Sequence, residues 1–374
     1  MRRTPPKPPT DDTRRFLPRY SDAAAKSRGV LSSPRSANLM NPLEWSEEES
    51  QAVLRAMATV ATDGGETELD AIGRQMLLAT RDFILRVSGG IPEGELISPA
   101  QLSEDLREPE KRRQATEFLI LVPYLPMVVS GDRVTRVEAF AAALDVRPNT
   151  LRDLRLVCDG RLGRWAVSYG RRTLAAYQPG GALAQLKAAG SAVLQFVGNK
   201  KVAARYSALQ NLPEGTLGRT FYDFYRARSF PLPGEKKSFS ELVVSHDMTH
   251  LLTGYNTDKS GEINVAGIEA GMSPTDLGFE MMLEVILLFH MGEDRIAGGL
   301  VEPGKGHFHP EQVMQAVQRG SQIKIDLIAG WDYWQDMEKP IEALRRRLGI
   351  DWVTEVEIPP PREHNAHVPE AEAS

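Results

Sequence analysis

The sequence predicts an all-α protein with two helical domains, and three observations support this prediction. Apolar residues recur every three to four positions through most of the chain, which is the spacing of a helix with one buried face. Alternating apolar and polar runs bounded by hairpin turns, the pattern of strands, are scarce. The chain has 374 residues, more than one hydrophobic core usually serves.

Both ends of the chain are expected to be disordered tails. Residues 1–40 are rich in Pro, Ser and Arg, and residues 356–374 have a similar composition without apolar periodicity. The Arg-rich start resembles a transit peptide, but its prolines and the Asp11–Asp12 pair suit neither an amphipathic helix nor a secretory signal. We therefore expect function to lie between the tails.

The composition restricts the class of protein and its partners. An apolar fraction of 41% and a charged fraction of 25% are ordinary for a folded, soluble protein. The net charge of −5 gives no reason to expect nucleic acid as a partner. The single cysteine, Cys158, excludes an internal disulfide and cysteine-rich metal sites, so a bound metal would need His and carboxylate ligands.

No apolar run reaches the length of about 18 residues that a membrane-spanning helix needs. The longest apolar segment, which starts at Phe279, is interrupted by Glu280 and Glu284. We therefore expect a cytoplasmic protein.

Residues 41–158 are predicted to form the first helical domain. Ser46 is placed to begin a helix, because Glu49 follows three residues later and apolar residues then recur at helical spacing. Further helices are expected through LDAIGRQMLLATRDFILRVSGG and through KRRQATEFLILVPYLPMVVSGDRVTRVEAFAAALDV.

Two segments of this domain are alike, MATVATDGGETELDAI and MVVSGDRVTRVEAFAAAL. Each has an apolar helix end, a Gly/Asp turn and an acidic residue that opens the next helix. The repeat resembles the internal duplication of TerB-like tellurite-resistance domains, in which acidic turn residues can bind a metal ion. The corresponding residues here are Asp63, Glu68, Asp132 and Glu138. Helix capping explains these acids more readily, so we predict no metal site from them.

Residues 159–182 are predicted to be a Gly-rich connector. Four arginines, at positions 161, 164, 171 and 172, alternate there with three aromatic residues. This pattern fits a basic patch for anionic headgroups or nucleic acid, or a solvated face with packed aromatic rings. We favour the solvated face.

Residues 183–355 are predicted to form the second helical domain, which contains HDMTHLLTGYNTDKSGE. His246 and His250 are one turn apart on the same helix face, and Asp247 lies about 100° around the axis. Gly254 is placed to end this helix, and Glu262 falls in the first turn of the next one. Three ligands from one helix and a fourth from the next can therefore converge on a metal ion.

Two histidines at this spacing also occur by chance on helices that bind no metal. The adjacent Asp247 favours a metal, because an unpaired carboxylate beside an apolar helix face is costly. Two familiar hydrolase classes are disfavoured. A zincin needs a Glu where Asp247 stands, and an HD-type phosphohydrolase needs an earlier histidine, whereas His246 is the first histidine in the chain.

Residues 180–352 resemble the coenzyme Q (ubiquinone) biosynthesis family, the fourth Coq protein. The resemblance is carried by LPEGTLGRTFYDFY, by HDMTHLLTGYNTDKSGEI and by WDYWQDMEKPIEALRRRLGI. It implies that His246, Asp247, His250 and Glu262 bind a divalent metal, usually taken as zinc. The donor types also suit iron or manganese. The segment SFSELVVS before the motif is less charged than in members of this family.

The resemblance implies a function in ubiquinone biosynthesis, namely metal-dependent oxidative decarboxylation of a prenylated quinone precursor at ring position C1. It also implies isoprenoid lipid and other quinone-biosynthesis proteins as partners, and peripheral attachment, here to the inner face of the membrane. The alternative is a non-catalytic, metal-stabilised, lipid-binding scaffold that organises the other enzymes. No catalytic residue is assigned from the sequence.

One helical side of the apolar segment after Ser273 carries four large apolar residues: Phe279, Met282, Ile286 and Phe289. They are candidates for a lipid groove, although an ordinary core helix would show the same pattern. His307 and His309, farther along the chain, are interpreted as loop residues.

Overall fold

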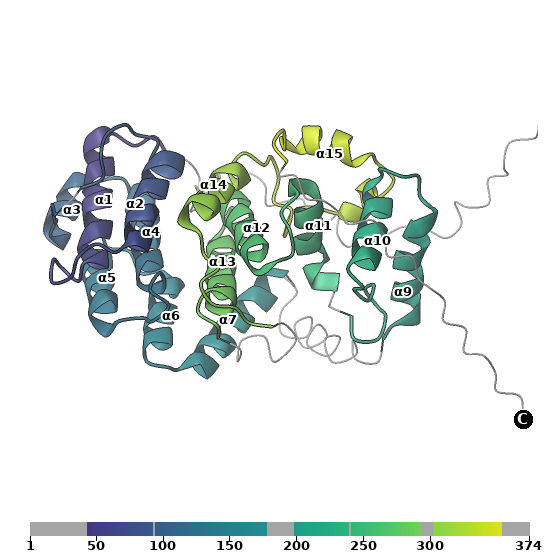
Figure 1. The fold of residues 1–374 in the computed structure, drawn as a ribbon, viewed down its shortest axis with the longest axis horizontal. Coiled ribbons are helices and arrows are strands. Elements are labelled where there is room, and N and C mark those ends of the chain that lie inside the picture. The colour runs from purple at the N-terminus through teal and green to yellow at the C-terminus, as the bar shows by residue number, and fades with distance from the viewer. Residues whose placement is uncertain (1–42, 93, 178–197, 239–240, 294–301, 354–374) are drawn as a thin grey trace, which may run out of the picture. The chain divides into compact units, whose positions relative to one another are not determined.

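The computed structural model describes residues 43–92, 94–177, 198–238, 241–293 and 302–353 (Figure 1). Within these ranges every regular element is a helix, and the only strand-like pairings are two isolated bridges, Thr216–Pro340 and Met291–Lys305. The all-α prediction is therefore confirmed. The predicted tails, 1–40 and 356–374, lie outside the described residues. None of the described helices is both long and apolar enough to cross a membrane.

The first of the helices before residue 178 begins with a capping box. The Ser46 side chain accepts a hydrogen bond from the Glu49 N–H, and the Glu49 carboxylate accepts one from the Ser46 N–H, as the sequence predicts. The α-helices are α1 (Glu47–Ala61), α2 (Ala71–Ala79), α3 (Pro99–Asp105), α4 (Pro109–Leu121), α5 (Gly131–Ala143), α6 (Asn149–Cys158) and α7 (Leu162–Tyr177). A π-helical segment, Thr80–Leu85, extends α2, and a 3-10 turn, Val122–Tyr124, extends α4.

The later helices include the two that carry the histidine motif, α11 and α12. They are α9 (Lys200–Ser207), α10 (Leu217–Ala227), α11 (Val244–Thr253), α12 (Lys259–Met272), α13 (Asp276–Phe289), α14 (Pro310–Gly320) and α15 (Ile341–Leu348). Short 3-10 turns occur at Ala208–Asn211, Glu241–Val243 and Tyr333–Asp336.

Helix α7 occupies most of the segment that the sequence suggested was a connector. Gly163 and Gly170 each weaken a helix by about 1 kcal/mol. Trp165 and Tyr169, one turn apart, are buried and stack with ring centroids 5.1 Å apart. Burial of these rings offsets the glycine cost, so the segment is helical.

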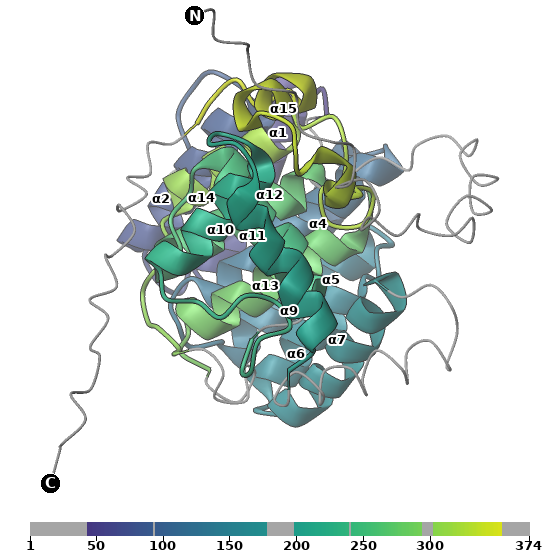
Figure 2. The same cartoon turned by 90° about the vertical axis from the view of Figure 1, so that its right-hand side faces the viewer.

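Two hydrophobic cores lie within the described residues. The first combines side chains of α1 to α7 with side chains of α12, α13 and α14. The second combines α10, α11 and α15 with other side chains of α12 and α14. Helix α12 contributes Ile263 and Ala266 to the first core and Val265 and Ile268 to the second. It lies beside α11, α13 and α14 (Figures 1 and 2). The domain boundaries predicted at residues 158 and 183 stay a prediction.

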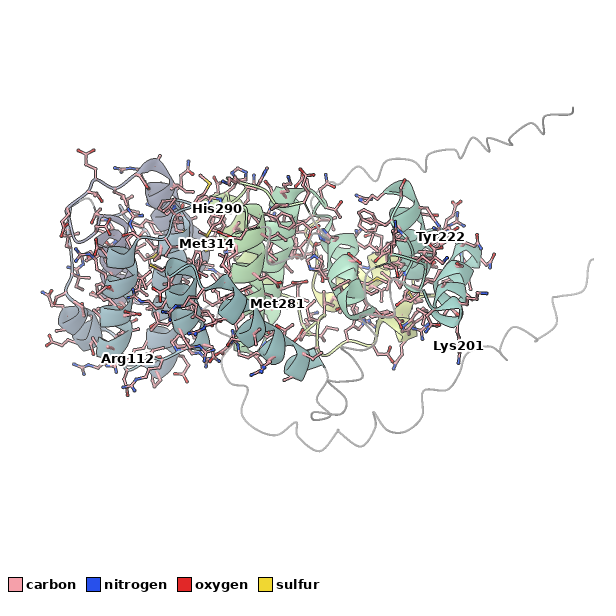
Figure 3. All side chains as sticks on the ribbon, turned by 90° about the horizontal axis from the view of Figure 1, so that it is seen from below. Arg112, Lys201, Tyr222, Met281, His290 and Met314 are labelled. Carbon is pink, nitrogen blue, oxygen red and sulfur yellow. The ribbon has the colours of Figure 1, made fainter. Side chains whose placement is uncertain are left out.

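The four lipid-groove candidates lie on the buried side of α13. Phe279, Met282, Ile286 and Phe289 are between 0% and 6% exposed and belong to the first core. Met281, labelled in Figure 3, is half-buried. In this structure the four side chains act as core residues, and their contact with lipid stays a prediction.

A buried histidine after α13 joins this helix to the region after α4. His290 (Figure 3) accepts a hydrogen bond at Nδ1 from the Phe308 N–H (3.2 Å), so its Nε2 donates to the Leu125 carbonyl (3.0 Å). Burial lowers the pKa of His290. The neutral ring therefore satisfies a donor and an acceptor from distant segments.

Helix α4 contains a buried carboxyl group, that of Glu117, with an unsatisfied hydrogen-bond acceptor. Glu117 is 1% exposed and its Oε2 has no hydrogen-bond partner. Burial raises the pKa of Glu117 well above its usual value, and Arg113 offsets this only in part. Because the folded pKa exceeds the unfolded one, this group lowers stability as the pH rises above the unfolded pKa of about 4.3.

We expect Glu117→Gln to raise the free energy of unfolding at pH 7 by at least about 1 kcal/mol, because the amide needs no buried charge. The gain should shrink towards pH 3, where the wild-type carboxyl is protonated in both states. Urea titrations at both pH values measure the difference. Glu110→Gln, in the exposed first turn of α4, is the control and should change stability by less than about 0.5 kcal/mol. Equal stability of Glu117→Gln and wild type at pH 7 would contradict this prediction.

Candidate metal centre

Two helix ends place the residues of the histidine motif. Helix α11 ends at Thr253, and Gly254 follows with a left-handed φ of 79° and donates its N–H to the His250 carbonyl (2.8 Å). This confirms the predicted end of the helix. Asp258 then caps α12 by accepting from the Gly261 N–H (2.7 Å), so Glu262 lies in the first turn as predicted.

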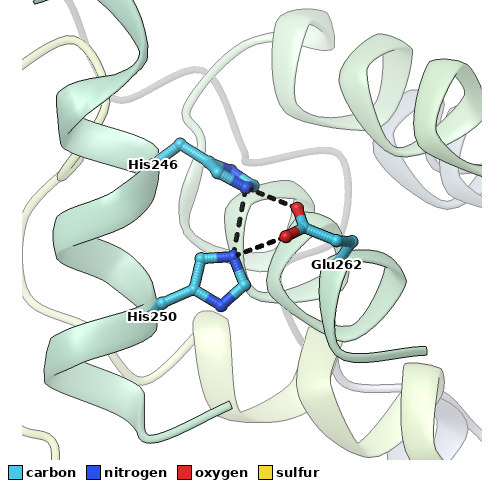
Figure 4. Close-up of side chains that lie close together, drawn as sticks. All are labelled: His246, His250 and Glu262. Carbon is cyan, nitrogen blue, oxygen red and sulfur yellow. Dashed lines mark hydrogen bonds and ion pairs between the residues drawn. The ribbon is translucent and has the colours of Figure 1, made fainter. Parts of the chain in front are cut away.

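Three of the four predicted ligands converge between these helices (Figure 4). His246 Nε2 lies 3.0 Å from Glu262 Oε2, and His250 Nε2 lies 3.5 Å from Glu262 Oε1. The two Nε2 atoms are 3.2 Å apart. One ligand atom from each of His246, His250 and Glu262 lies within 4.8 Å of the others, so this group could hold a metal ion. His250 is buried, whereas His246 and Glu262 are half-buried.

The second nitrogen of each imidazole ring has a defined partner. His246 Nδ1 lies 2.8 Å from Glu269 Oε1, and His250 Nδ1 lies 3.0 Å from the Tyr255 carbonyl oxygen. A ring that donates from Nδ1 to an oxygen presents the lone pair of Nε2 to the opposite side. Metal-binding histidines typically have such an oxygen partner, which orients the ring. Both Nε2 atoms are thus directed towards Glu262.

The charges of the site are arranged for a cation. Burial opposes protonation of His246, but the charge of Glu269 and the contact with Glu262 outweigh it and hold the pKa of His246 well above its usual value. Burial also acts to raise the pKa of Glu262, yet His250 and His246 hold that pKa well below normal. Glu269 is 1% exposed, and its Oε2 has no partner. The two carboxylates thus lie at the two nitrogens of the His246 ring, Glu269 at Nδ1 and Glu262 at Nε2, and a divalent ion on the Nε2 side would supply compensating positive charge.

Asp247, the fourth predicted ligand, is not in the group of three. Its Oδ2 accepts a short hydrogen bond from the Tyr225 hydroxyl of α10. Burial raises the pKa of Asp247, and burial beside Asp247 raises the pKa of Tyr225. This contact joins the LPEGTLGRTFYDFY segment to the histidine motif. Ligation by Asp247 stays a prediction.

Sequence reasoning missed two residues of the site, Glu269 and Tyr225. A signal for Glu269 was present, because it follows Glu262 by seven residues and therefore shares its helix face. Tyr225 carries no comparable signal, since its partner lies on another helix.

The acidic turn residues of the N-terminal repeat lie apart from this site. Asp63 accepts from Arg133 (3.3 Å) and Glu138 accepts from Arg155 (2.9 Å). Glu68 and Asp132 are exposed. In the described part of the chain, none of these four residues belongs to a group that could hold a metal ion.

Comparison with known proteins finds a distant relative. The chain is 29% identical over 167 residues to the ubiquinone biosynthesis protein COQ4 homolog, mitochondrial, of Rattus norvegicus. The match covers 42% of this chain and 56% of the rat protein, so the chain spans about half of its relative's length. No family model matches the chain. The comparisons support a distant likeness to the COQ4 protein and give no support to the TerB-like resemblance of residues 41–158.

We expect Glu269→Gln to weaken metal binding by about 10- to 100-fold, the range found when the oxygen partner of a metal-binding histidine is replaced. The amide keeps an oxygen near His246 Nδ1 but removes the negative charge. Competition with a chromophoric chelator measures the affinity. Glu342→Gln, on the exposed face of α15, is the matched control and should leave it unchanged. An affinity of Glu269→Gln within twofold of wild type would show that Glu269 does not orient His246.

Proposed function

We propose that this chain acts in ubiquinone biosynthesis with a divalent metal held by His246, His250 and Glu262. The observation that carries the proposal is the convergence of two imidazole Nε2 atoms on one carboxylate, with the Nδ1 atoms oriented by Glu269 and Tyr255. The similarity to the rat COQ4 protein is the basis for proposing ubiquinone biosynthesis as the pathway.

The ligand set favours a site that retains an open coordination position. Two histidines and one carboxylate are the protein ligands of several catalytic zinc sites and of non-haem iron oxygenases. The engagement of Asp247 with Tyr225 supports a set of three rather than four. Zinc is the predicted ion, and the same donors suit iron or manganese.

The proposed reaction is the oxidative decarboxylation of a prenylated aromatic precursor at ring position C1. The carboxyl group leaves as carbon dioxide, one oxygen atom from dioxygen enters as the new hydroxyl, and the other oxygen atom is reduced to water by two protons and two electrons from an external two-electron reductant. A bound metal would act as a Lewis acid towards the precursor's oxygen atoms and, if redox-active, would exchange electrons with dioxygen. His246, His250 and Glu262 would hold that ion, and Glu269 would keep the His246 ring in position.

The proposed partners follow from the same pathway. They are the prenylated precursor or another isoprenoid lipid, and other quinone-biosynthesis proteins. We propose a cytoplasmic location with peripheral attachment to the inner face of the membrane. The rat relative is described as mitochondrial.

The second candidate function is a non-catalytic scaffold in which the metal is structural. This alternative requires a closed coordination shell. Asp247 would complete such a shell as a fourth ligand beside His250, whose side chain is 0% exposed.

One assay separates the two candidates. The metal-loaded wild type is incubated with a carboxylated, prenylated phenol and a two-electron reductant under ¹⁸O₂, and the product is examined by mass spectrometry. An enzyme releases carbon dioxide and yields a hydroxylated product that contains ¹⁸O, whereas His250→Ala yields none. A wild type that holds metal but forms no product supports the scaffold. A wild type that binds no divalent metal contradicts both candidates.

A further inference from the structure

A basic surface pocket lies between α6 and α7, away from the histidine motif in sequence. Its volume is about 590 Å³, and the residues that line it include Arg152, Arg164, Arg171 and Arg172 but no carboxylate. Helix α7 itself contains three arginines and no acidic residue. We propose that this pocket binds the phosphate group of an anionic small molecule or lipid headgroup.

One arginine of the pocket, Arg172, is held in place by two buried carboxylates. Arg172 Nε donates to both carboxylate oxygens of Glu280 (2.9 and 2.8 Å), and its Nη2 donates to Asp153. Asp153 and Glu280 are buried, at 2% and 4% exposed, so they face the protein interior. The guanidinium of Arg172 is therefore fixed before any ligand arrives, which reduces the entropy lost on binding.

Two guanidinium groups already meet at one oxygen atom. Arg152 Nη2 (2.6 Å) and Arg172 Nη1 (2.8 Å) both donate to the hydroxyl oxygen of Ser168. Arg152 also lies 3.6 Å from Asp153. Arginine pairs that converge in this way match the several acceptor oxygens of a phosphate. Asn149, in the first turn of α6, adds an amide and the positive end of a helix dipole to the pocket.

Two exposed arginines add positive charge to the pocket. Arg164 and Arg171 are exposed and line the same pocket. Their like charges repel each other and a bound anion would relieve that repulsion, whereas Arg172 is already paired with Asp153 and Glu280. The neighbouring aromatic rings, Trp165 and Tyr169, are buried, so they cannot stack on bases as a nucleic-acid site requires.

The test compares two variants of equal charge in the full chain. Arg164→Gln/Arg171→Gln removes two charges from the pocket, and Arg107→Gln/Arg346→Gln removes two exposed charges elsewhere. One arm titrates inorganic pyrophosphate into each protein by calorimetry at low salt. The other measures co-sedimentation with phosphatidylcholine vesicles that contain or lack phosphatidylglycerol. Thermal melting checks that both variants are folded.

Wild type and the control variant are expected to bind a phosphate ligand, and the pocket variant to bind it about tenfold or more weakly. If the pocket variant binds pyrophosphate more weakly than wild type, the ligand is a free phosphorylated molecule. If it loses only binding to the phosphatidylglycerol vesicles, the ligand is a lipid headgroup. The proposal is overturned if wild type binds in neither arm, or if the pocket variant loses no more affinity than the control variant. None of these outcomes depends on the metal centre.

Discussion

His250→Ala is expected to lower the affinity for a divalent metal by more than about 100-fold, beyond the effect of losing a residue that only orients a ligand. The alanine removes one of three ligand atoms that lie within 4.8 Å of one another. It also leaves the Tyr255 carbonyl without its imidazole donor. Metal content after dialysis and chelator competition measure the loss.

His309→Ala is the matched control for this prediction. His309 is an exposed histidine outside the group of three, so its loss should leave the metal content unchanged. Similar metal content in His250→Ala and wild type would show that the ion, if any, is bound elsewhere.

Gly261→Ala is expected to lower the free energy of unfolding by about 3 kcal/mol or more, at the upper end of the effect of overpacking. A Cβ at this position would lie 1.9 Å from the carbonyl oxygen of Asn256, and that backbone atom cannot move without displacing the loop between α11 and α12. Because Glu262 is the next residue, the same displacement should also reduce metal binding. Urea unfolding and metal analysis of the same preparation measure both effects.

Gly170→Ala provides the comparison, since a Cβ at Gly170 meets nothing within 4 Å and the residue lies inside α7. Alanine there should stabilise the protein by up to about 1 kcal/mol. If Gly261→Ala were as stable as Gly170→Ala, the close approach of the loop to α12 would be wrong.

Much of the candidate metal centre could be predicted because its features are local. The i, i+4 spacing of His246 and His250, the glycine after α11 and the position of Glu262 in the next first turn are properties of single helices and one loop. The structure brings these three side chains together as that reasoning requires.

The other features of the site depend on packing between distant segments. The hydrogen bond from Tyr225 to Asp247 joins α10 to α11, and no periodicity in either helix indicates it. The sequence did not predict helix α7, because its two glycines have low helix propensity. Helix propensity does not take into account the burial of Trp165 and Tyr169. Likewise, α12 contributes side chains to both hydrophobic cores. The order of the helices along the chain does not indicate this.

The most direct test of the proposed metal centre is X-ray absorption spectroscopy at the metal K-edge of the metal-loaded protein. We expect a first shell that contains two imidazole nitrogens and at least one carboxylate oxygen, at about 2.0–2.2 Å if the ion is zinc. In His250→Ala, any residual signal should contain one imidazole at most. A shell without imidazole in the wild type, or a wild type that retains no metal, would contradict the assignment of His246, His250 and Glu262 as the ligands.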